Sequence, residues 1–595
     1  MITKMYDRNA RAAGCPGLVT RLVTRASIGL AACLVAGTAW AQAPAPIVRG
    51  DMATRVDQYL TRLVPYGFSG AVLVAKDGQI VLEKGYGFAN RETKQPYTTD
   101  LVSCIGSVTK QFTAAAVLAL EMDGKLSTGD PISKYLPGVP PDKAGITIHH
   151  LLTHTAGFSG DLGGGDEEPI TRDALVAKVL AAPLASKPGE RFEYSNEGFS
   201  LAAAIVERVS GKGYETYLRE RVLLPAGLKD TGYLEPAWPL TRLPIGYGPE
   251  GKPWGRVYKN GWLPDGPGWY LRGNGGIQSS LDDLYRWHLA LETTKVLSAE
   301  ALAKYQTGHV ASMGNERYAY GWGVVTTRRG TKAVTHNGGN GFFFTDFRRY
   351  LDEKVVIIAM TNEAVIPATQ LAPRQLEALV FGDEPVVMPP EPRAIAREVR
   401  DAKAGRYALE GGGTVVVRAT ADGLEAEADD PTLLGGLGNV TAPGGRFADL
   451  ESRSMAVLGA AAKGDFRPIF EAFNDERPFE VVQRNQTRFW SEWRTEFGEF
   501  QRLELIGTGN FQGDPAVTVR LRFEKGGPVL QLMWGPRRLA GFRSLPAAAV
   551  PLVAESPQTW VYFNYRSPAP VRFTFGDAGT MTLETPKGVL RGTRR

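Results

Sequence analysis

The amino-acid sequence predicts an α+β fold for about its first two thirds: an antiparallel sheet flanked by helices, with a helical insertion. Three observations support this prediction. A helical pattern followed by a hairpin pattern occupies residues 50–90. Helical patterns and long Gly/Pro loops fill residues 130–291, and strand-like runs return between residues 321 and 362. Because helices cover the faces of such sheets, the two groups of strands are expected to form one sheet that is discontinuous in sequence.

The first helix and hairpin are predicted from hydrophobic periodicity. Apolar residues at helical spacing mark one face of a helix: Met52, Val56, Tyr59, Leu60 and Leu63. Apolar and polar residues then alternate on both sides of Asp77-Gly78, the strongest short signal for a hairpin. An apolar-periodic run from Leu101 to Leu126 predicts a second helix.

A second region is expected after residue 382. Four prolines between Gly382 and Arg393 predict a linker over residues 383–400. Residues 401–595 are predicted to form a C-terminal β-rich accessory region, with an α+β unit inserted at about residues 449–547. This region contains no recognisable catalytic constellation.

The N-terminus has the pattern of an export signal. Basic residues up to Arg25 precede an apolar run, and Ala39-Trp40-Ala41 is an A-x-A cleavage site, which predicts a signal peptide over residues 1–41. The run is shorter than the roughly 20 residues of a membrane-spanning helix. We therefore expect a periplasmic or secreted protein with no transmembrane segment after signal removal. Leu30–Cys33 resembles a lipoprotein box, so lipid anchoring at Cys33 is the less favoured alternative.

The formal net charge of +5 comes mostly from this segment. Its removal leaves a chain of about +1, which gives no electrostatic basis for nucleic acid as a partner. Of the three cysteines only Cys104 would remain, so no intrachain disulfide is expected. Cys104 is interpreted as a small buried residue rather than a nucleophile.

Ser107 and Lys110 are the first candidate catalytic residues. On a helix, residues at i and i+3 share a face, so the hydroxyl and the amine would lie side by side. The plain alternative is a serine helix cap with the lysine in solvent. Two further motifs favour catalysis: Tyr194-Ser195-Asn196 in a polar loop before a helix, and His336-Asn337-Gly338 at the end of a strand-like run.

In the order S-x-x-K, Y-x-N, H-x-G, these motifs resemble those of the serine β-lactamase and penicillin-binding-protein superfamily. The resemblance is to the branch that holds class C β-lactamases, D-aminopeptidases, DD-carboxypeptidases and related esterases. Wider stretches such as "IGSVTKQFTAAAVLALEMDGKLSTGDPISKYLP" and "PGERFEYSNEGFSLAAAIVERVSG" carry it over about residues 50–382. It implies a β-lactamase/DD-peptidase-like serine hydrolase domain that needs no cofactor or metal.

The resemblance and the chemistry of the side chains together imply four roles. Ser107 Oγ would attack a carbonyl and hold the acyl group. Lys110 or Tyr194 would accept the serine proton, and the sequence leaves open which of them is the base. Asn196 would bridge Lys110 and the substrate amide.

The third motif would complete the site and departs from the β-lactamase pattern. The resemblance implies an oxyanion hole formed by the backbone N–H groups of Ser107 and Gly339, and glycines at 338 and 339 would let the strand approach the substrate closely. β-Lactamases carry Lys-Thr-Gly or Lys-Ser-Gly where this chain has His336-Asn337-Gly338. Histidine is largely neutral at pH 7, so carboxylates should be held less firmly. This favours an esterase or aminopeptidase over a β-lactamase.

Three other functions fit the sequence less well. His150 and His154 have the i, i+4 spacing of zinc ligands, but the glutamate of H-E-x-x-H is missing. An α/β-hydrolase needs G-x-S-x-G, whereas the glycines around Ser69 and Ser159 stand in another register. The aromatic residues of "RFWSEWRTEF" could bind a wall polymer or a partner protein, although core packing explains them more simply.

The sequence thus predicts an exported serine hydrolase that forms an acyl-enzyme on Ser107 and cleaves a small ester, amide or peptide substrate. A β-lactamase or DD-carboxypeptidase acting on β-lactams or wall peptides is the alternative. A catalytically weak protein that binds the cell wall or a partner is the alternative from another class.

Overall fold

The computed structural model describes residues 44–595, with gaps at 159–164, 249–250, 313, 411–412, 422, 429–430, 435–442, 474–478, 512–513, 526, 536–537, 546–548, 566–568 and 586–587. The predicted signal peptide, its lipoprotein box and Ser159 lie outside the described residues. Within these ranges, no helix combines the length and the apolar character that crossing a membrane requires.

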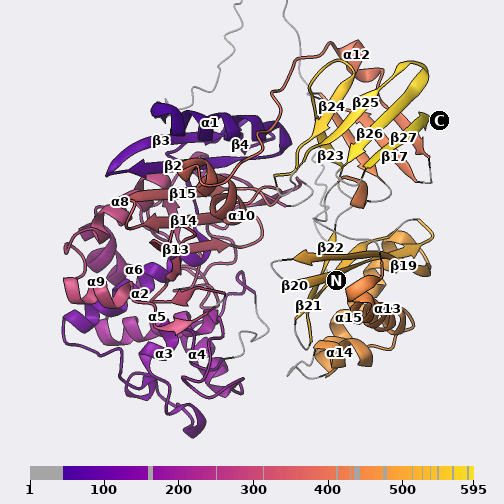
Figure 1. The fold of residues 1–595 in the computed structure, drawn as a ribbon. Helices are drawn as coiled ribbons and strands as arrows, with labels where there is room; N and C mark the ends of the chain where they lie inside the picture. Colours follow the sequence, from indigo (N-terminus) through magenta and orange to yellow (C-terminus); the bar gives the residue numbers. More distant parts are fainter. Residues whose placement is uncertain are drawn as a thin grey trace, which may run out of the picture. The chain divides into compact units, whose positions relative to one another are not determined.

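A nine-stranded antiparallel sheet forms the centre of the first region (Figure 1). In spatial order its strands are β1 (Ile47–Val48), β3 (Gln79–Tyr86), β2 (Gly70–Lys76), β15 (Val355–Thr361), β14 (Phe344–Tyr350), β13 (Lys332–Gly339), β12 (Gly323–Thr326), β11 (Arg317–Tyr318) and β10 (Val310–Ala311). The N-terminal hairpin of β2 and β3 joins the later strands where Val74 lies opposite Ile357. The predicted sheet, discontinuous in sequence, is therefore confirmed.

Helices cover both faces of this sheet, which explains why its central strands are apolar without alternation. β15 is buried along its whole length. In β2, Val72 and Val74 pack into one hydrophobic core, whereas Leu73 and Ala75 pack into another. The first core is shared with α1 (Gly50–Leu63), α10 (Ala368–Leu371) and α11 (Glu377–Phe381). The second is shared with α2, α5 and α8 of the helical insertion.

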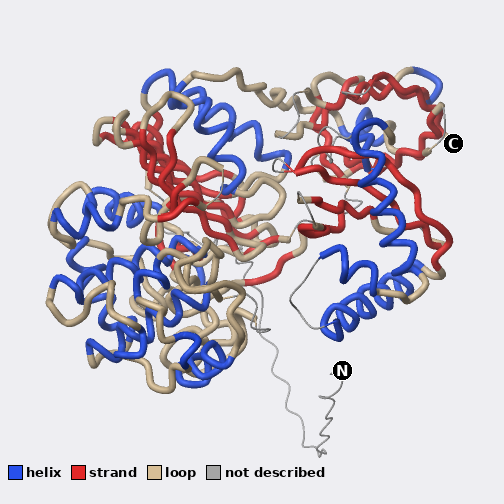
Figure 2. Tube along the Cα trace, turned by 60° about the horizontal axis from the view of Figure 1, so that its bottom comes forward, coloured by secondary structure: helices blue, strands red, loops and turns tan. Residues whose placement is uncertain are grey.

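The helical insertion lies between the hairpin and β10 in the sequence, and Figure 2 shows its helices gathered beside the sheet. Its helices are α2 (Thr109–Met122), α3 (Ile148–Leu152), α4 (Arg172–Ala181), α5 (Asn196–Ser210), α6 (Tyr214–Leu218), α7 (Leu224–Ala226), α8 (Leu281–Leu291) and α9 (Ala299–Tyr305). Short strand pairs connect them: β4 (Phe88–Asn90) with β5 (Gln95–Pro96), β6 (Val102–Cys104) with β9 (Gln278–Ser280), and β7 (Gly246–Tyr247) with β8 (Pro253–Gly255).

The C-terminal region contains a closed antiparallel barrel, preceded by the short helix α12 (Arg397–Asp401). The barrel strands are β16 (Gly405–Leu409), β17 (Thr414–Ala419), β18 (Leu424–Ala428), β23 (Val550–Ala554), β24 (Thr559–Tyr562), β25 (Val571–Phe575), β26 (Thr580–Thr585) and β27 (Gly588–Arg594). Along β18 and β25 every second residue is buried, as expected when one face of each strand points into the barrel.

An α+β unit lies between β18 and β23 in the sequence. Its helices are α13 (Ala448–Ala462), α14 (Arg467–Phe473) and α15 (Phe479–Phe497), and its strands are β19 (Phe500–Phe511), β20 (Asp514–Phe523), β21 (Val529–Trp534) and β22 (Leu539–Leu545). The helices and the four-stranded sheet share one hydrophobic core. Trp490 of α15 lies in this core and is 2% exposed, so part of the aromatic run "RFWSEWRTEF" is packed inside the unit.

Candidate active site

Ser107 lies in a single 3-10 turn, Gly106–Val108, between β6 and α2. The pairing of β6 with β9 fixes the chain just before this turn. Gly106 has a φ of +51°, and a Cβ there would come within 2.5 Å of the Gly339 nitrogen. A Cβ on Gly338 would likewise come within 2.5 Å of the Ser107 nitrogen. Glycine at both positions therefore lets β13 pass directly beside the turn that carries Ser107.

Lys110 follows in the first turn of α2, where it is completely buried. Its Nζ lies 3.0 Å from Ser107 Oγ. The same nitrogen donates hydrogen bonds to Asn196 Oδ1 at 2.8 Å and to the backbone carbonyl of Asn274 at 2.9 Å. Three oxygen atoms thus fix the position of the amine.

Burial lowers the pKa of the Lys110 amine to about 7, although Asp166 and Glu197 act in the opposite direction. A large fraction of the molecules therefore carries an unprotonated amine at neutral pH. In that form both N–H groups can be donated to the two carbonyl acceptors, which leaves the nitrogen lone pair for the Ser107 hydroxyl.

Tyr194 reaches the same two side chains from the turn before α5. The centre of its ring lies 4.8 Å from Lys110 Nζ, and its hydroxyl is close enough to the Ser107 side chain to interact with it. The residue as a whole is 41% exposed, but its hydroxyl is enclosed, and burial raises the pKa of the phenol above its ordinary value. The phenol therefore keeps its proton at neutral pH.

His336 lies next to the cluster of Ser107, Lys110 and Tyr194 but is not part of it. Its Nε2 is 2.9 Å from the Tyr318 hydroxyl, and its Nδ1 is 2.6 Å from the Asn337 carbonyl. Burial and the charge of Lys110 lower the pKa of the ring to about 3, so the imidazole is neutral. It lines a cavity of about 200 Å³ together with Tyr194 and Tyr318.

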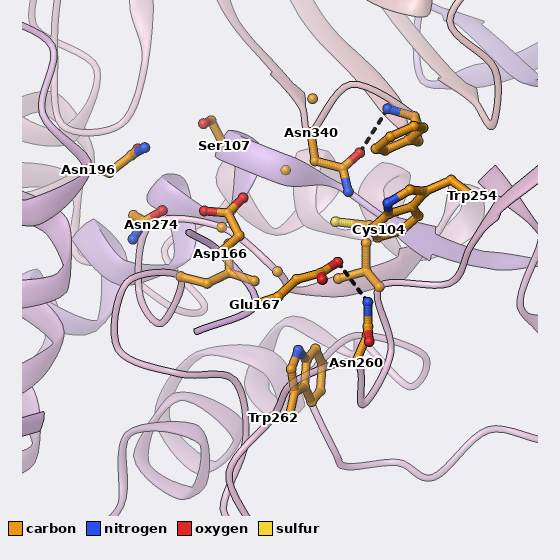
Figure 3. Close-up of a pocket in the computed structure, with 17 residues that line it drawn as sticks. Cys104, Ser107, Asp166, Glu167, Asn196, Trp254, Asn260, Trp262, Asn274 and Asn340 are labelled. Carbon is orange, nitrogen blue, oxygen red and sulfur yellow. Dashed lines mark hydrogen bonds between the residues drawn. The ribbon is translucent and has the colours of Figure 1, made fainter. Parts of the chain in front are cut away.

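Ser107 itself opens into a larger cavity of about 310 Å³ (Figure 3). The polar residues that line it include Asn196, Asn274, Asn340 and two acids, Asp166 and Glu167. Its apolar wall is formed by Trp254, Val257, Trp262, Leu271 and Phe342. Trp254 and Trp262 come from the long aromatic loop between residues 244 and 271, whose described residues form little regular structure apart from the short β7–β8 pair.

The structure brings together most of the residues singled out from the sequence. Ser107, Tyr194 and Asn196 surround the amine of Lys110, and Gly338 and Gly339 border the turn that carries Ser107. Three residues of the site were not predicted from the sequence. No sequence pattern marks the Asn274 carbonyl, because every residue has a backbone carbonyl group. The acids of "GGGDEEP" were the only available hint of Asp166, and His154 was noted only for its spacing.

Cys104, another reactive side chain near the site, is kept unreactive by burial. Cys104 is 4% exposed, and burial raises the pKa of its thiol to about 11, so it remains protonated at neutral pH.

The zinc hypothesis assumed that His150 and His154 share a helix, but α3 ends at Leu152 and His154 has a φ of +57°. Among the described residues, no group of three or more His, Cys, Asp or Glu side chains could hold a metal ion.

Sequence and structure comparisons identify relatives of the chain. It is 34% identical over 260 residues to the putative penicillin-binding protein PbpX of Bacillus subtilis, covering 43% of this chain and 62% of that protein, less than two thirds of its length. It is 30% identical over 293 residues to esterase EstB of Burkholderia gladioli, covering 43% of this chain and 73% of that protein.

The fold is similar to that of an octameric penicillin-binding protein homologue from Pyrococcus abyssi. The TM-score is 0.50 at 22% identity, over 91% of this chain and 98% of that one. The family model described as Beta-lactamase matches residues 56–380, more than half of the chain and the part that carries the nine-stranded sheet and the Ser107 site. The chain therefore belongs to the Beta-lactamase family.

Proposed function

We propose that this protein is a serine hydrolase that forms an acyl-enzyme on Ser107 and hydrolyses small esters or amides. The observation that carries the proposal is the arrangement around the Lys110 amine. Its Nζ lies 3.0 Å from Ser107 Oγ, while Asn196 and Asn274 supply two carbonyl acceptors. Esterase EstB, which is 30% identical, supports an ester substrate.

In the first half of the reaction, the unprotonated Lys110 amine takes the proton from Ser107 as Oγ attacks the substrate carbonyl. The negative charge that develops on the carbonyl oxygen is stabilised by the backbone N–H groups of Ser107 and Gly339. Lowering of the lysine pKa to about 7 and raising of the tyrosine pKa favour Lys110 over Tyr194 as the base.

Tyr194 then serves as the proton donor to the leaving group, and it recovers its proton from the Lys110 ammonium. Its hydroxyl suits this role because it is protonated at neutral pH and lies next to the Ser107 side chain, close to where the leaving group departs. In the second half of the reaction, Lys110 takes a proton from the water that attacks the acyl-enzyme, and this proton passes to Ser107 Oγ as the acyl–serine bond breaks.

The test is labelling with a fluorophosphonate, which reacts with activated serine hydroxyls. We expect one labelled peptide that contains Ser107, and loss of labelling in Ser107→Ala. Ser127→Ala is the matched control, because Ser127 is exposed and lines neither of the two cavities. Lys110→Ala and Tyr194→Phe should each lower turnover by about 10²–10⁴. A folded wild-type protein that is never labelled would refute the proposal.

A further inference from the structure

The cavity above Ser107 contains an acid to which the reaction assigns no role. Asp166 lines the cavity, and its carboxylate points towards Ser107 in Figure 3. The neighbouring Glu167 is already occupied, because its Oε1 accepts a hydrogen bond from Asn260 Nδ2 at 2.7 Å. Within the described part of the chain, the Asp166 side chain has no hydrogen-bond or ion-pair partner.

The charge of this cavity is negative. None of the described residues that line it is Lys or Arg, and its two acids are Asp166 and Glu167. Among the described residues, the cation that acts on Asp166 is the amine of Lys110, which is buried and only partly protonated at neutral pH. Asp166 is exposed as a residue, but partial desolvation of its carboxyl group in the cavity raises its pKa, so a cation that entered the cavity would stabilise the carboxylate.

The position of Tyr194 indicates which part of the substrate enters here. Tyr194, the proposed proton donor to the leaving group, lines the smaller cavity with His336. Ser107 and Gly339 line the larger cavity. Since the leaving group must depart on the side of its proton donor, the acyl group is assigned to the larger cavity. Its apolar wall, where Trp254 and Phe342 stack with centroids 4.5 Å apart, suits an apolar or aromatic acyl side chain.

We propose that Asp166 binds an ammonium group on the acyl part of the substrate, so that the preferred substrates are esters or amides of apolar amino acids. This proposal rests on the proposed function, since it needs an acyl group on Ser107. An amine next to the scissile carbonyl would lie between the nucleophile and Asp166, and the side chain would lie against the aromatic wall. Asp166 is then a specificity residue that touches the substrate, and it takes no part in proton transfer.

A pair of boronic acids tests this assignment without a known substrate, because the boron forms a reversible bond with an activated serine. One is (1-amino-2-phenylethyl)boronic acid as the racemate, and the other is 2-phenylethylboronic acid, which lacks only the amine. With the wild-type protein, we expect the inhibition constant of the amine-bearing compound to be about 10- to 100-fold lower. Asp166→Asn should bring the ratio of the two constants close to one.

Glu168→Gln is the matched control, since Glu168 is exposed on the same loop and does not line the cavity. The ratio should be unchanged in this variant. Equal inhibition of the wild type by both compounds, or a ratio that survives Asp166→Asn, would overturn the inference. Fluorophosphonate labelling of Ser107 reports separately on the proposed function, so the two failures are distinguishable.

Discussion

His154 and Tyr194 stack face to face, with ring centroids 4.2 Å apart and ring planes at 28°. His154 is 1% exposed, and burial together with the nearby Lys110 charge holds its pKa well below the usual value. Its Nδ1 accepts a hydrogen bond from the Ser195 backbone N–H at 3.0 Å. A neutral histidine thus fixes both the ring of Tyr194 and the turn that carries it.

Loss of this ring should affect turnover more than folding. His154→Asn keeps an acceptor for the Ser195 N–H and tolerates the positive φ, but it removes the stack on Tyr194. Because such aromatic pairs contribute about 0.5–1.5 kcal/mol, we expect kcat for a p-nitrophenyl ester to fall about 3- to 10-fold. His309→Asn is the control, since His309 stacks on Tyr320 and lines neither cavity. Equal kcat in the two variants would show that His154 does not position Tyr194.

The strands of the sheet, Lys110 and the three predicted residues around its amine could be found from the sequence because each is marked by a short local pattern. Periodicity marks Val72 and Leu73 as strand residues, and S-x-x-K and Y-x-N are short motifs. The remaining features depend on tertiary approach. Asp166 and Asn274 reach the site from loops without periodicity, so no spacing relates them to Ser107. The histidine spacing gave the wrong geometry because α3 ends two residues before His154.

The pKa of Lys110 predicts a pH dependence of the reaction that distinguishes the two candidate bases, Lys110 and Tyr194. If Lys110 must be unprotonated, kcat/KM for a neutral ester falls about tenfold per pH unit below about 7 and is constant above it. If Tyr194 were the base, the rise of kcat/KM with pH would continue above pH 10, because burial raises the pKa of its phenol. A profile measured from pH 5 to pH 10.5 separates the two cases.

The charge of Asp166 provides a check on this interpretation. Asp166 raises the pKa of Lys110, so Asp166→Asn should move the lower limb of the profile to lower pH. A limb near pH 7 that does not move in this variant would show that the titrating group is not Lys110.

Replacement of His336 tests whether the neutral ring limits carboxylate binding. His336→Lys introduces a cation beside Tyr194, where the pKa of about 3 keeps the native imidazole uncharged. We expect KM for an ester whose leaving group carries a carboxylate to fall about 3- to 10-fold, relative to the methyl ester of the same compound. His336→Gln removes the ring without adding charge and should leave that ratio unchanged. An unchanged ratio in His336→Lys would mean that position 336 does not face the substrate.

Gly338 makes the closest backbone contact at the site, so adding a single methyl group there is predicted to lower turnover severely. A Cβ on Gly338 would lie 2.1 Å from the Ile105 carbonyl and 2.5 Å from the Ser107 nitrogen, both of which are backbone atoms. Gly338→Ala must therefore push β13 away from the nucleophile turn and move one proposed oxyanion donor relative to the other. We expect kcat to fall at least about 10²-fold, the usual effect of losing one such donor.

The matched control for this substitution is Gly145→Ala, because a Cβ on Gly145 meets nothing within 4 Å and its φ is not in the left-handed region. This variant should retain wild-type kcat and thermal stability. If Gly338→Ala also kept near-normal kcat while remaining folded, the Gly339 N–H could not be an oxyanion donor. The hydroxyl of Ser107 would then face a different wall of the cavity from the one that β13 provides.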